Sequence, residues 1–509
     1  MKSYFEKVRN SFHLETLLRI LFVCGIVLYL RQYLANRPLW LDEAMVSLNI
    51  IRYSIFDFLS QPLPYHKQAA PFGFLVIEKL ATYLFGISEY ALRLFPLICG
   101  FISLWLFSLM AKVYLQRRFV LFALFGFVIT PALVYYSSEV KPYYSDVFFV
   151  LLSYVVIAQS CLGELNWHKA GMMGLLGAIM IWFSFPVVFV LAGIAATLLL
   201  TALIQRDWPR FSKVGFISFF WFISFIFYYA VSLHNIIRVQ GPISYWASGY
   251  ISFVDANSWL VVFNNILGSP LGFSNCLWLA GSLFFIGGYS FFKEDKKKFF
   301  FLLTPLIFVF LVSGLHKYSC KTRLALFLVP IFFVLIINGV RTVSLRMKKY
   351  GLIIDLLLIG ILFYGSLFAV GKGFLNPKNK EDVRSVISYV HGYKQAGDAF
   401  CIYTSAEPAI LYYNHLFGYS FPKKNYKLST YGDLESIKKD LDQLRSIPRV
   451  WLVFSHIKSH DQQRDDDLSI KYLLQSGGKL LDKFSSVGAG AYLFDLSYFL
   501  DTNAGSSAF

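Results

Sequence analysis

The chain has 509 residues, of which 57% are hydrophobic, 19% aromatic and only 15% charged. A soluble protein carries about 25% charged residues, so this composition excludes an ordinary soluble protein and indicates a membrane protein with many spans. The net charge of +17 does not indicate nucleic-acid binding, because the Lys and Arg residues form short clusters between apolar runs instead of one basic domain.

The first apolar run, Ile20–Leu34, follows a short basic segment that contains Lys2, Lys7 and Arg9. Basic residues beside a span favour the cytosolic side, so we expect a cytosolic N-terminus. No small-residue cleavage site follows the run, which predicts an uncleaved first span and not a signal peptide.

Two adjacent carboxylates, Asp42 and Glu43, come directly after this span, in the segment Arg37-Pro38-Leu39-Trp40-Leu41-Asp42-Glu43-Ala44. Asp42 is either the N-cap of a short helix or a catalytic base at the membrane surface, where it faces a lipid-borne substrate. Glu43 suits the first turn of such a helix. The segment by itself favours the cap.

The chain from Leu48 to Phe85 is broken by prolines and carries His66 and Lys67, so it predicts amphipathic helices on the outer surface. The first span and ten later ones give about eleven, and the strongly basic short loops all fall on one side. The later spans are expected at Tyr90–Val113, Phe119–Tyr136, Val147–Cys161, Ala170–Phe183, Pro186–Ile204, Val214–Ser232, a run ending at Lys293–Lys298, Phe299–Ser313, Leu324–Val340 and Leu352–Val370.

Residues 372–509 are far more polar than residues 1–371, which predicts a transmembrane module followed by a small soluble α/β domain. An odd number of spans places this domain on the extracytoplasmic side. It has no glycine pattern for binding nucleotides. The sequence predicts strands at Ala399–Tyr403 and Val450–Phe454, helices at Leu434–Leu444 and Leu468–Leu474, and a hairpin of Lys479–Phe484 with Ala491–Phe494.

Four segments on the expected outer side carry charges at the membrane edge, where a charge is costly and therefore suggests function. Each has a local explanation: a snorkelling Lys, a carboxylate at a helix start, or an Arg that anchors a span. Together, an acid and convergent cations suit a reaction with an anionic lipid leaving group. The segments contain Asp42 and Glu43; His66 and Lys67; Glu139, Lys141 and Asp146; and His316, Lys317, Lys321 and Arg323.

The six cysteines show no ligand spacing, so we expect no structural metal. Cys276 and Cys320 could both face outward and pair, but free thiols are favoured. His456 and His460 have the i, i+4 spacing of metal ligands, although a polar surface loop is the favoured interpretation.

An aromatic outer segment offers two interpretations, an interfacial belt or a surface that stacks against a sugar. The belt is favoured. The residues concerned are Tyr245, Trp246, Tyr250 and Trp259.

The order of these motifs resembles the membrane-embedded GT-C glycosyltransferases that use polyprenyl-phosphate sugars, such as protein O-mannosyltransferases and the lipid A aminoarabinose transferase (glycosyltransferase family 39-like). The resemblance covers residues 36–150 and 316–335, and more weakly Asp398–Tyr413. Five motifs in order favour the catalytic interpretation of Asp42 over the cap. They are Leu39–Ala44, Gln68–Leu80 with only one of the usual two prolines, Phe85–Pro96, Tyr135–Asp146 and Arg323–Pro330.

The resemblance implies an α-helical polytopic GT-C fold and an inverting transfer of a sugar to a hydroxyl. It implies Asp42 as the base, with Glu43 orienting the loop. No cofactor is expected; a divalent metal is possible but not predicted. The donor phosphate would be held by Arg323, Lys141, Lys67 and His66, and the acceptor by Glu139, Asp146 and Tyr143.

The partners implied are a polyprenyl-phosphate sugar, membrane lipids, and an acceptor that is a lipid-linked glycan, a polysaccharide, lipid A or a protein. The location implied is a bacterial inner membrane with an extracytoplasmic site. Three alternatives stay open: a lipid or sugar transporter or flippase, a ligase of the O-antigen type, and a non-catalytic scaffold. Internal repeats and midplane charges, which are typical of transporters, are not found.

Overall fold

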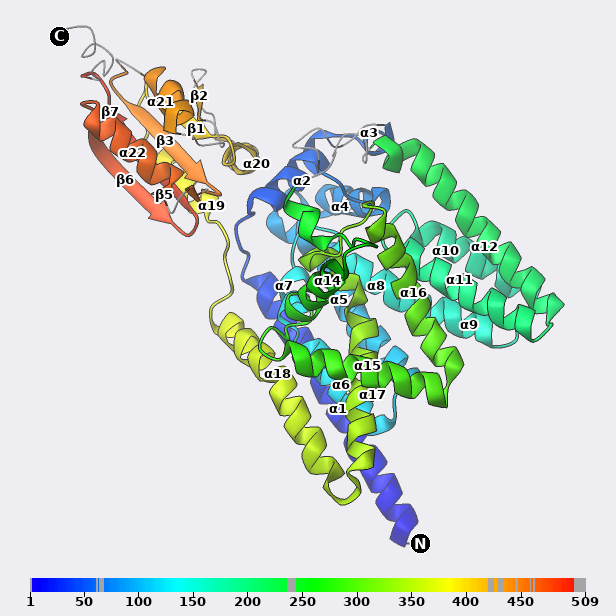
Figure 1. Ribbon diagram of the computed structural model, residues 1–509. Coiled ribbons are helices and arrows are strands. Elements are labelled where there is room, and N and C mark those ends of the chain that lie inside the picture. Colours follow the sequence, from blue (N-terminus) through cyan, green and yellow to red (C-terminus); the bar gives the residue numbers. More distant parts are fainter. Residues whose placement is uncertain are drawn as a thin grey trace.

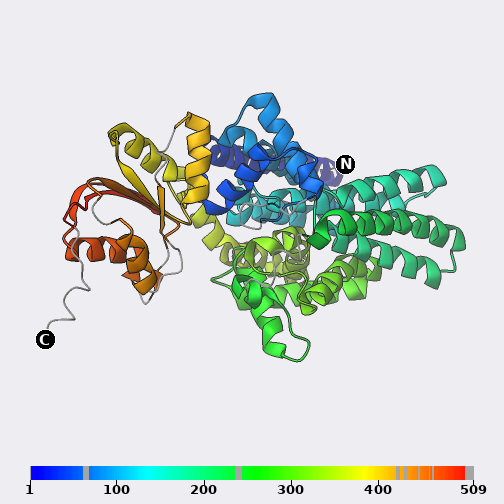
Figure 2. The same ribbon diagram turned by 90° about the horizontal axis from the view of Figure 1, so that it is seen from above.

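A bundle of long helices and a small α/β unit make up the structure, a computed structural model that describes residues 2–60, 63, 68–235, 244–419, 425–428, 434–444, 447–457, 459–460 and 463–498. The bundle extends to residue 375, and the α/β unit follows at one end of it (Figure 1). Seen from above, the α/β unit lies to one side, and the teal helices project on the opposite side (Figure 2).

The first half of the bundle contains α1 (Lys2–Leu34), α2 (Leu41–Arg52), α3 (Asp57–Ser60), α4 (Phe72–Phe85), α5 (Glu89–Tyr114), α6 (Arg117–Val128), α7 (Pro131–Tyr136), α8 (Tyr143–Leu152), η1 (Ser153–Ala158), α9 (Gln159–Leu162), α10 (Trp167–Met180), α11 (Val187–Ile204), α12 (Trp208–Tyr228) and η2 (Tyr229–Leu233). The second half contains η3 (Ser244–Gly249), α14 (Ala256–Gly268), α15 (Leu277–Glu294), α16 (Lys296–Gly314), η4 (Thr322–Leu328), α17 (Val329–Arg346), η5 (Lys348–Tyr350) and α18 (Gly351–Leu375).

Within the described residues, seven helices are long and apolar enough to cross a membrane. The other four expected spans coincide with α1, with α10, with α15 and with α6 followed by α7. The seven are Glu89–Tyr114, Tyr143–Leu162, Val187–Ile204, Trp208–Leu233, Lys296–Gly314, Thr322–Arg346 and Lys348–Leu375.

The expected span Phe119–Tyr136 is not one continuous helix, because the chain breaks between α6 and α7 at Pro131. Proline has no backbone N–H, and it moves the preceding residue out of the helical region. Thr130 accordingly has an extended backbone, with φ −70° and ψ 115°. The short helix α7 then leads into the acidic loop that contains Glu139.

The candidate span Thr322–Arg346, which consists of η4 and α17, is the most deeply buried of the seven, with 89% of its apolar window inside the protein. It packs closely on α15: a Cβ on Gly339 would lie 2.0 Å from the carbonyl oxygen of Leu283, and one on Gly287 would lie 1.9 Å from that of Leu335. Only glycine permits such an approach of two backbones. Since η4 runs directly into α17, this packing fixes the position of η4.

The α/β unit has a five-stranded sheet in the order β2-β1-β3-β7-β6. Strand β1 is parallel to β2 and β3, whereas β7 is antiparallel to β3 and β6. The expected strands, helices and terminal hairpin are all present, with slightly different ends. The elements are α19 (Val383–Tyr393), β1 (Ala399–Tyr403), α20 (Glu407–Phe417), β2 (Asn425–Leu428), α21 (Leu434–Asp442), β3 (Val450–Ser455), β4 (Ser459–His460), β5 (Gln463–Arg464), α22 (Asp465–Gln475), β6 (Lys479–Ser486) and β7 (Ala489–Asp495).

Helix α2 joins the bundle to the α/β unit. Its buried residues Val46 and Ile50 share one apolar core with Tyr412 and Tyr413 of α20, and α20 faces α2 in Figure 1. The Tyr413 hydroxyl also accepts a hydrogen bond from the Leu39 backbone N–H at 2.8 Å. The helix that carries Asp42 is therefore positioned by both parts of the chain.

Candidate active site

Asp42 is the second residue of α2 and not its N-cap. The N-cap is Trp40, which makes no side-chain capping bond. The Asp42 carboxylate instead accepts a hydrogen bond from the Arg323 guanidinium, with 2.5 Å between Oδ2 and the terminal nitrogen. The structure thus joins the first acidic motif to the late Arg motif, which lies 281 positions further along the chain.

Arg323 lies in η4 and is surrounded by aromatic rings. Its guanidinium carbon is 5.3 Å from the ring centre of Trp40, 5.6 Å from that of Tyr143 and 5.4 Å from that of Trp246. Aromatic faces attract a cation and leave its N–H donors free for an anion. Nε of Arg323 is buried and has no hydrogen-bond partner among the described residues. Trp246, expected in an aromatic belt, contacts this site.

Glu43 points away from Asp42, into the core. Both of its oxygens accept from Arg93, at 2.9 and 2.8 Å, and one also accepts from the Val140 backbone N–H at 2.9 Å. Burial raises the pKa of Glu43, but Arg93 and these hydrogen bonds outweigh burial and hold the pKa below its usual value. Glu43 therefore joins α2, α5 and the second acidic loop.

Glu139 and Lys141 lie on that second loop and face the site. Glu139 is fully buried and accepts from the Trp40 indole N–H at 3.3 Å. Lys141 donates to Gln68 at 2.6 Å, and its charge acts on Asp42. Asp146 turns away: it accepts from the Ser184 hydroxyl at 2.6 Å, and no hydrogen bond or ion pair between described residues links it to Asp42.

Lys380 is a site residue that the sequence interpretation missed. It lies in the linker 376–382 between α18 and α19, with Nζ only 3.5 Å from the ring centre of Trp40. It forms an ion pair with Glu139 at 3.8 Å. Arg37, also missed as a site residue, lies over the Tyr135 ring at 4.2 Å. For Lys380, the only sequence signal was the charged character of the linker directly after the last span.

Positive charge exceeds negative charge in this cluster. Arg323, Lys141, Lys380 and Arg37 face two carboxylates, Asp42 and Glu139, because Glu43 is already matched by Arg93. Burial raises the pKa of Asp42, but Lys141, Arg323 and Lys380 outweigh burial and leave it lowered. Burial raises the pKa of Glu139, and there it prevails over Lys380. The excess of two positive charges suits an anionic ligand.

His66 and Lys67 fall outside the described residues. Cys276 and Cys320 are both free thiols, as was favoured. His456 contacts the carboxylate of Glu381 at 2.6 Å.

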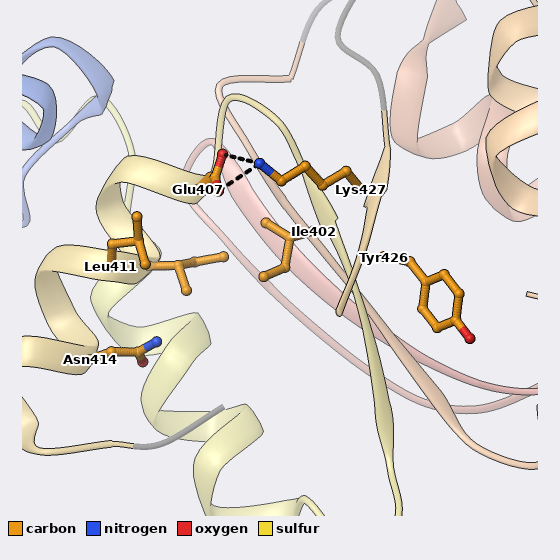
Figure 3. A pocket seen from close by; sticks show the side chains of 7 residues that line it. Ile402, Glu407, Leu411, Asn414, Tyr426 and Lys427 are labelled. Carbon is orange, nitrogen blue, oxygen red and sulfur yellow. Dashed lines mark hydrogen bonds and ion pairs between the residues drawn. The ribbon is translucent and has the colours of Figure 1, made fainter. Parts of the chain in front are cut away.

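A hollow of about 120 Å³ in the α/β unit contains the ion pair of Glu407 with Lys427 (Figure 3). It lies between α20 and strands β1 and β2, and it shares no residue with the Asp42 cluster.

No family model matches the sequence, and the comparison with curated proteins finds no match. Solved structures do share the fold. ArnT from Cupriavidus metallidurans bound to undecaprenyl phosphate has a TM-score of 0.54 at 11% identity, over 95% of this chain and 98% of that chain.

The archaeal oligosaccharyltransferase AglB from Archaeoglobus fulgidus, in complex with an inhibitory peptide and a dolichol-phosphate, has a TM-score of 0.54 at 10% identity, over 95% of this chain and 74% of that chain. The apo form of the Archaeoglobus fulgidus oligosaccharyltransferase has a TM-score of 0.50 at 12% identity, over 93% and 74%. The chain therefore has the GT-C fold and, with its seven apolar helices, is an integral membrane protein.

Proposed function

We propose that the protein is an inverting glycosyltransferase that moves a sugar from a polyprenyl-phosphate donor to a hydroxyl of an envelope acceptor. The observation that carries the proposal is the contact of Asp42 with Arg323, inside an aromatic cluster with excess positive charge. The fold supports the proposal as well. It is shared with an ArnT structure that contains undecaprenyl phosphate and with an AglB structure that contains a dolichol-phosphate.

Asp42 suits the role of base better than the other carboxylates. Its side chain is 20% exposed and reachable by an acceptor. Glu43 and Glu139 are fully buried, and Glu43 is already bound to Arg93. A base must reach the hydroxyl proton that it removes, and exposure satisfies that need. We propose positioning roles for Glu43 and Glu139.

Arg323 is the proposed main contact of the donor phosphate. Inverting displacement requires the acceptor oxygen and the leaving oxygen on opposite sides of the anomeric carbon, so base and phosphate cannot share one point. We propose that the hydrogen bond of Arg323 to Asp42 opens when the donor binds. A guanidinium can then present two parallel N–H groups to phosphate. This exchange would release Asp42 for the acceptor.

We also propose that the N-terminus is cytosolic and that the chain divides into a transmembrane module, residues 1–371, and an extracytoplasmic domain, residues 372–509. The N-terminus and the turn between α17 and α18 lie at the end of the bundle away from the α/β unit (Figure 1). That turn carries Arg346, Lys348 and Lys349, which favour the cytosol. Residues 372–509 and the site would then be extracytoplasmic.

The proposal is tested by a transfer assay with the full chain in nanodiscs. A panel of radiolabelled polyprenyl-phosphate sugars is offered with a total envelope extract as acceptor. We expect one donor to be bound and its sugar to be transferred to a hydroxyl with inverted configuration. Failure to bind any donor, in a folded preparation, would contradict the proposal and favour a transporter.

The pH dependence offers a further test. Asp42 accepts a proton only when ionised, so kcat/KM for the donor falls as the pH falls through the pKa of Asp42 in the free enzyme. Because this pKa is lowered, we expect kcat/KM to hold until below about pH 4, the ordinary range for an aspartate. Lys141 is the cation with the largest lowering effect, so Lys141→Met should move the acid limb to higher pH.

The quantity measured is the pH at which kcat/KM falls, and not the plateau value of kcat/KM. The plateau is unsuitable because, on the present proposal, Lys141→Met also weakens donor binding. Full activity after return to neutral pH excludes unfolding as the cause of the limb. An acid limb at the same pH in both proteins would show that Asp42 is not the group that titrates.

A further inference from the structure

Lys380 shares one aromatic ring with Arg323. Its ammonium nitrogen is 3.5 Å from the ring centre of Trp40 and 4.7 Å from that of Tyr135. The Arg323 guanidinium lies 5.3 Å from the same Trp40 ring. Two cations that lie against one indole ring repel each other, so an anion that binds between them stabilises the arrangement.

The protein itself neutralises Lys380 only partly. Its ion-pair partner is Glu139 Oε2 at 3.8 Å, which is too long for a hydrogen bond. That oxygen is buried and, among the described residues, has no hydrogen-bond partner. Burial lowers the pKa of Lys380, the charges of Glu139 and Glu43 oppose this lowering, and those of Arg323 and Arg37 add to it. An additional anion would stabilise the ammonium.

Glu381 fixes the linker beside Lys380. One Glu381 oxygen accepts from the Leu41 backbone N–H at 3.0 Å and from the Ser455 hydroxyl at 3.3 Å. The other contacts His456 Nδ1 at 2.6 Å. Glu381 thereby connects the start of α2 to the end of β3, so the place of Lys380 depends on how the α/β unit sits on α2.

The turn of the terminal hairpin supports the linker from its other side. The Asp382 N–H donates to the Val487 carbonyl at 2.7 Å. Gly488 has φ +64°, and a Cβ there would lie 2.6 Å from the Lys380 carbonyl oxygen. Glycine is therefore required at this position both by its conformation and by the contact.

We infer that Lys380 is a second anchor for the phosphate of the lipid donor, placed in the site by the linker and held there by the α/β unit. The inference rests on the proposed function and adds a contact from outside the bundle. Arg323 and Lys380 then hold the phosphate from two sides, and the affinity for the donor depends on the correct seating of the α/β unit.

The test measures the Kd of farnesyl phosphate for the full chain in nanodiscs, with farnesol as the ligand that lacks phosphate. Lys380→Met should raise the Kd about tenfold or more, as expected for the loss of one charge-assisted hydrogen bond. Farnesol binding should not change. Lys378→Met is the matched control, because Lys378 is in the same linker and exposed. Lys380→Arg should retain most of the affinity.

A double variant separates phosphate binding from simple neutralisation of Glu139. If Lys380 only matches the Glu139 charge, Lys380→Met with Glu139→Gln removes both charges and restores the wild-type Kd. If Lys380 contacts phosphate, the double variant stays weak. A restored Kd, or an unchanged Kd in Lys380→Met, would overturn the inference.

Gly488→Ala moves the linker without removing a charged group. We expect it to raise the Kd of farnesyl phosphate and leave that of farnesol unchanged. An unchanged Kd for farnesyl phosphate would overturn the dependence on the α/β unit. Arg323→Ala serves as the reference: if it weakens binding while Lys380→Met does not, the proposed function stands and this inference fails. If the wild-type protein discriminates farnesyl phosphate from farnesol no better than Arg323→Ala does, both fail.

Discussion

Asp42→Asn is expected to lower the transfer rate by on the order of 10²–10⁴, because it removes the group that accepts the hydroxyl proton. The amide nearly retains the shape of the carboxylate, so α2 should remain in place. Donor binding should persist or tighten, since Arg323 no longer has an ionised partner at 2.5 Å to leave when phosphate arrives. The measurements are single-turnover transfer with a bound radiolabelled donor, and the Kd of that donor.

Glu139→Gln is the matched control for Asp42→Asn, because it neutralises a second carboxylate in the same cluster that is fully buried. It should lower the rate much less than Asp42→Asn does. Near-normal transfer by Asp42→Asn would keep the enzyme class and move the base to Glu139, Glu43 or Asp146. Loss of donor binding together with loss of transfer would instead assign Asp42 to donor binding.

Arg93→Met is expected to destabilise the fold by about 3–5 kcal/mol, because it leaves the fully buried Glu43 carboxylate without its cation. Arg93 also donates to the Arg37 carbonyl at 2.6 Å, so its removal frees the entry to α2 as well. The measurement is the unfolding equilibrium in mild detergent titrated with SDS. Transfer should fall too, since Glu43 connects α2 to Val140 at 2.9 Å.

Glu43→Gln combined with Arg93→Met should recover much of this stability. The amide oxygen can still accept from Val140, and no unmatched charge is left in the core. The contribution of Glu43 to the stability of the fold also depends on pH. The pKa of Glu43 is lowered on folding, so its contribution to stability is present above the unfolded pKa of about 4.3 and is lost as the pH falls through the folded value. Equal stability of Arg93→Met and the double variant would contradict a buried-charge origin.

The sequence already indicated where the chemistry would lie. Hydrophobic runs report membrane spans through composition alone, and prolines and polar turns report where the runs stop. Asp42, Lys141 and Arg323 each follow or precede such a run, so the sequence could assign them to one side of the membrane. The strands Ala399–Tyr403 and Val450–Phe454 were equally readable, because each is a short apolar run between polar segments; in the structure the second strand extends to Ser455.

The separation of Asp42 from Glu43 depended on helix geometry and on packing. Successive residues of an α-helix point about 100° apart. Once α2 forms, one carboxylate must face Arg323 and the other the core, where Arg93 receives it. Adjacency in the sequence had suggested a shared site, but the helix places Asp42 at the proposed reaction site and Glu43 in the core.

Local sequence determined the membrane protein class, seven of the expected spans and the motif that carries Asp42, because these depend on composition and short-range periodicity. Only the tertiary structure decided which charges meet. Arg323 lies 281 positions from Asp42, and their contact depends on where the bundle places η4, which packs against α8. Lys380 resembles its exposed neighbour Lys378 in sequence, and only the seating of the α/β unit on α2 brings it to Trp40.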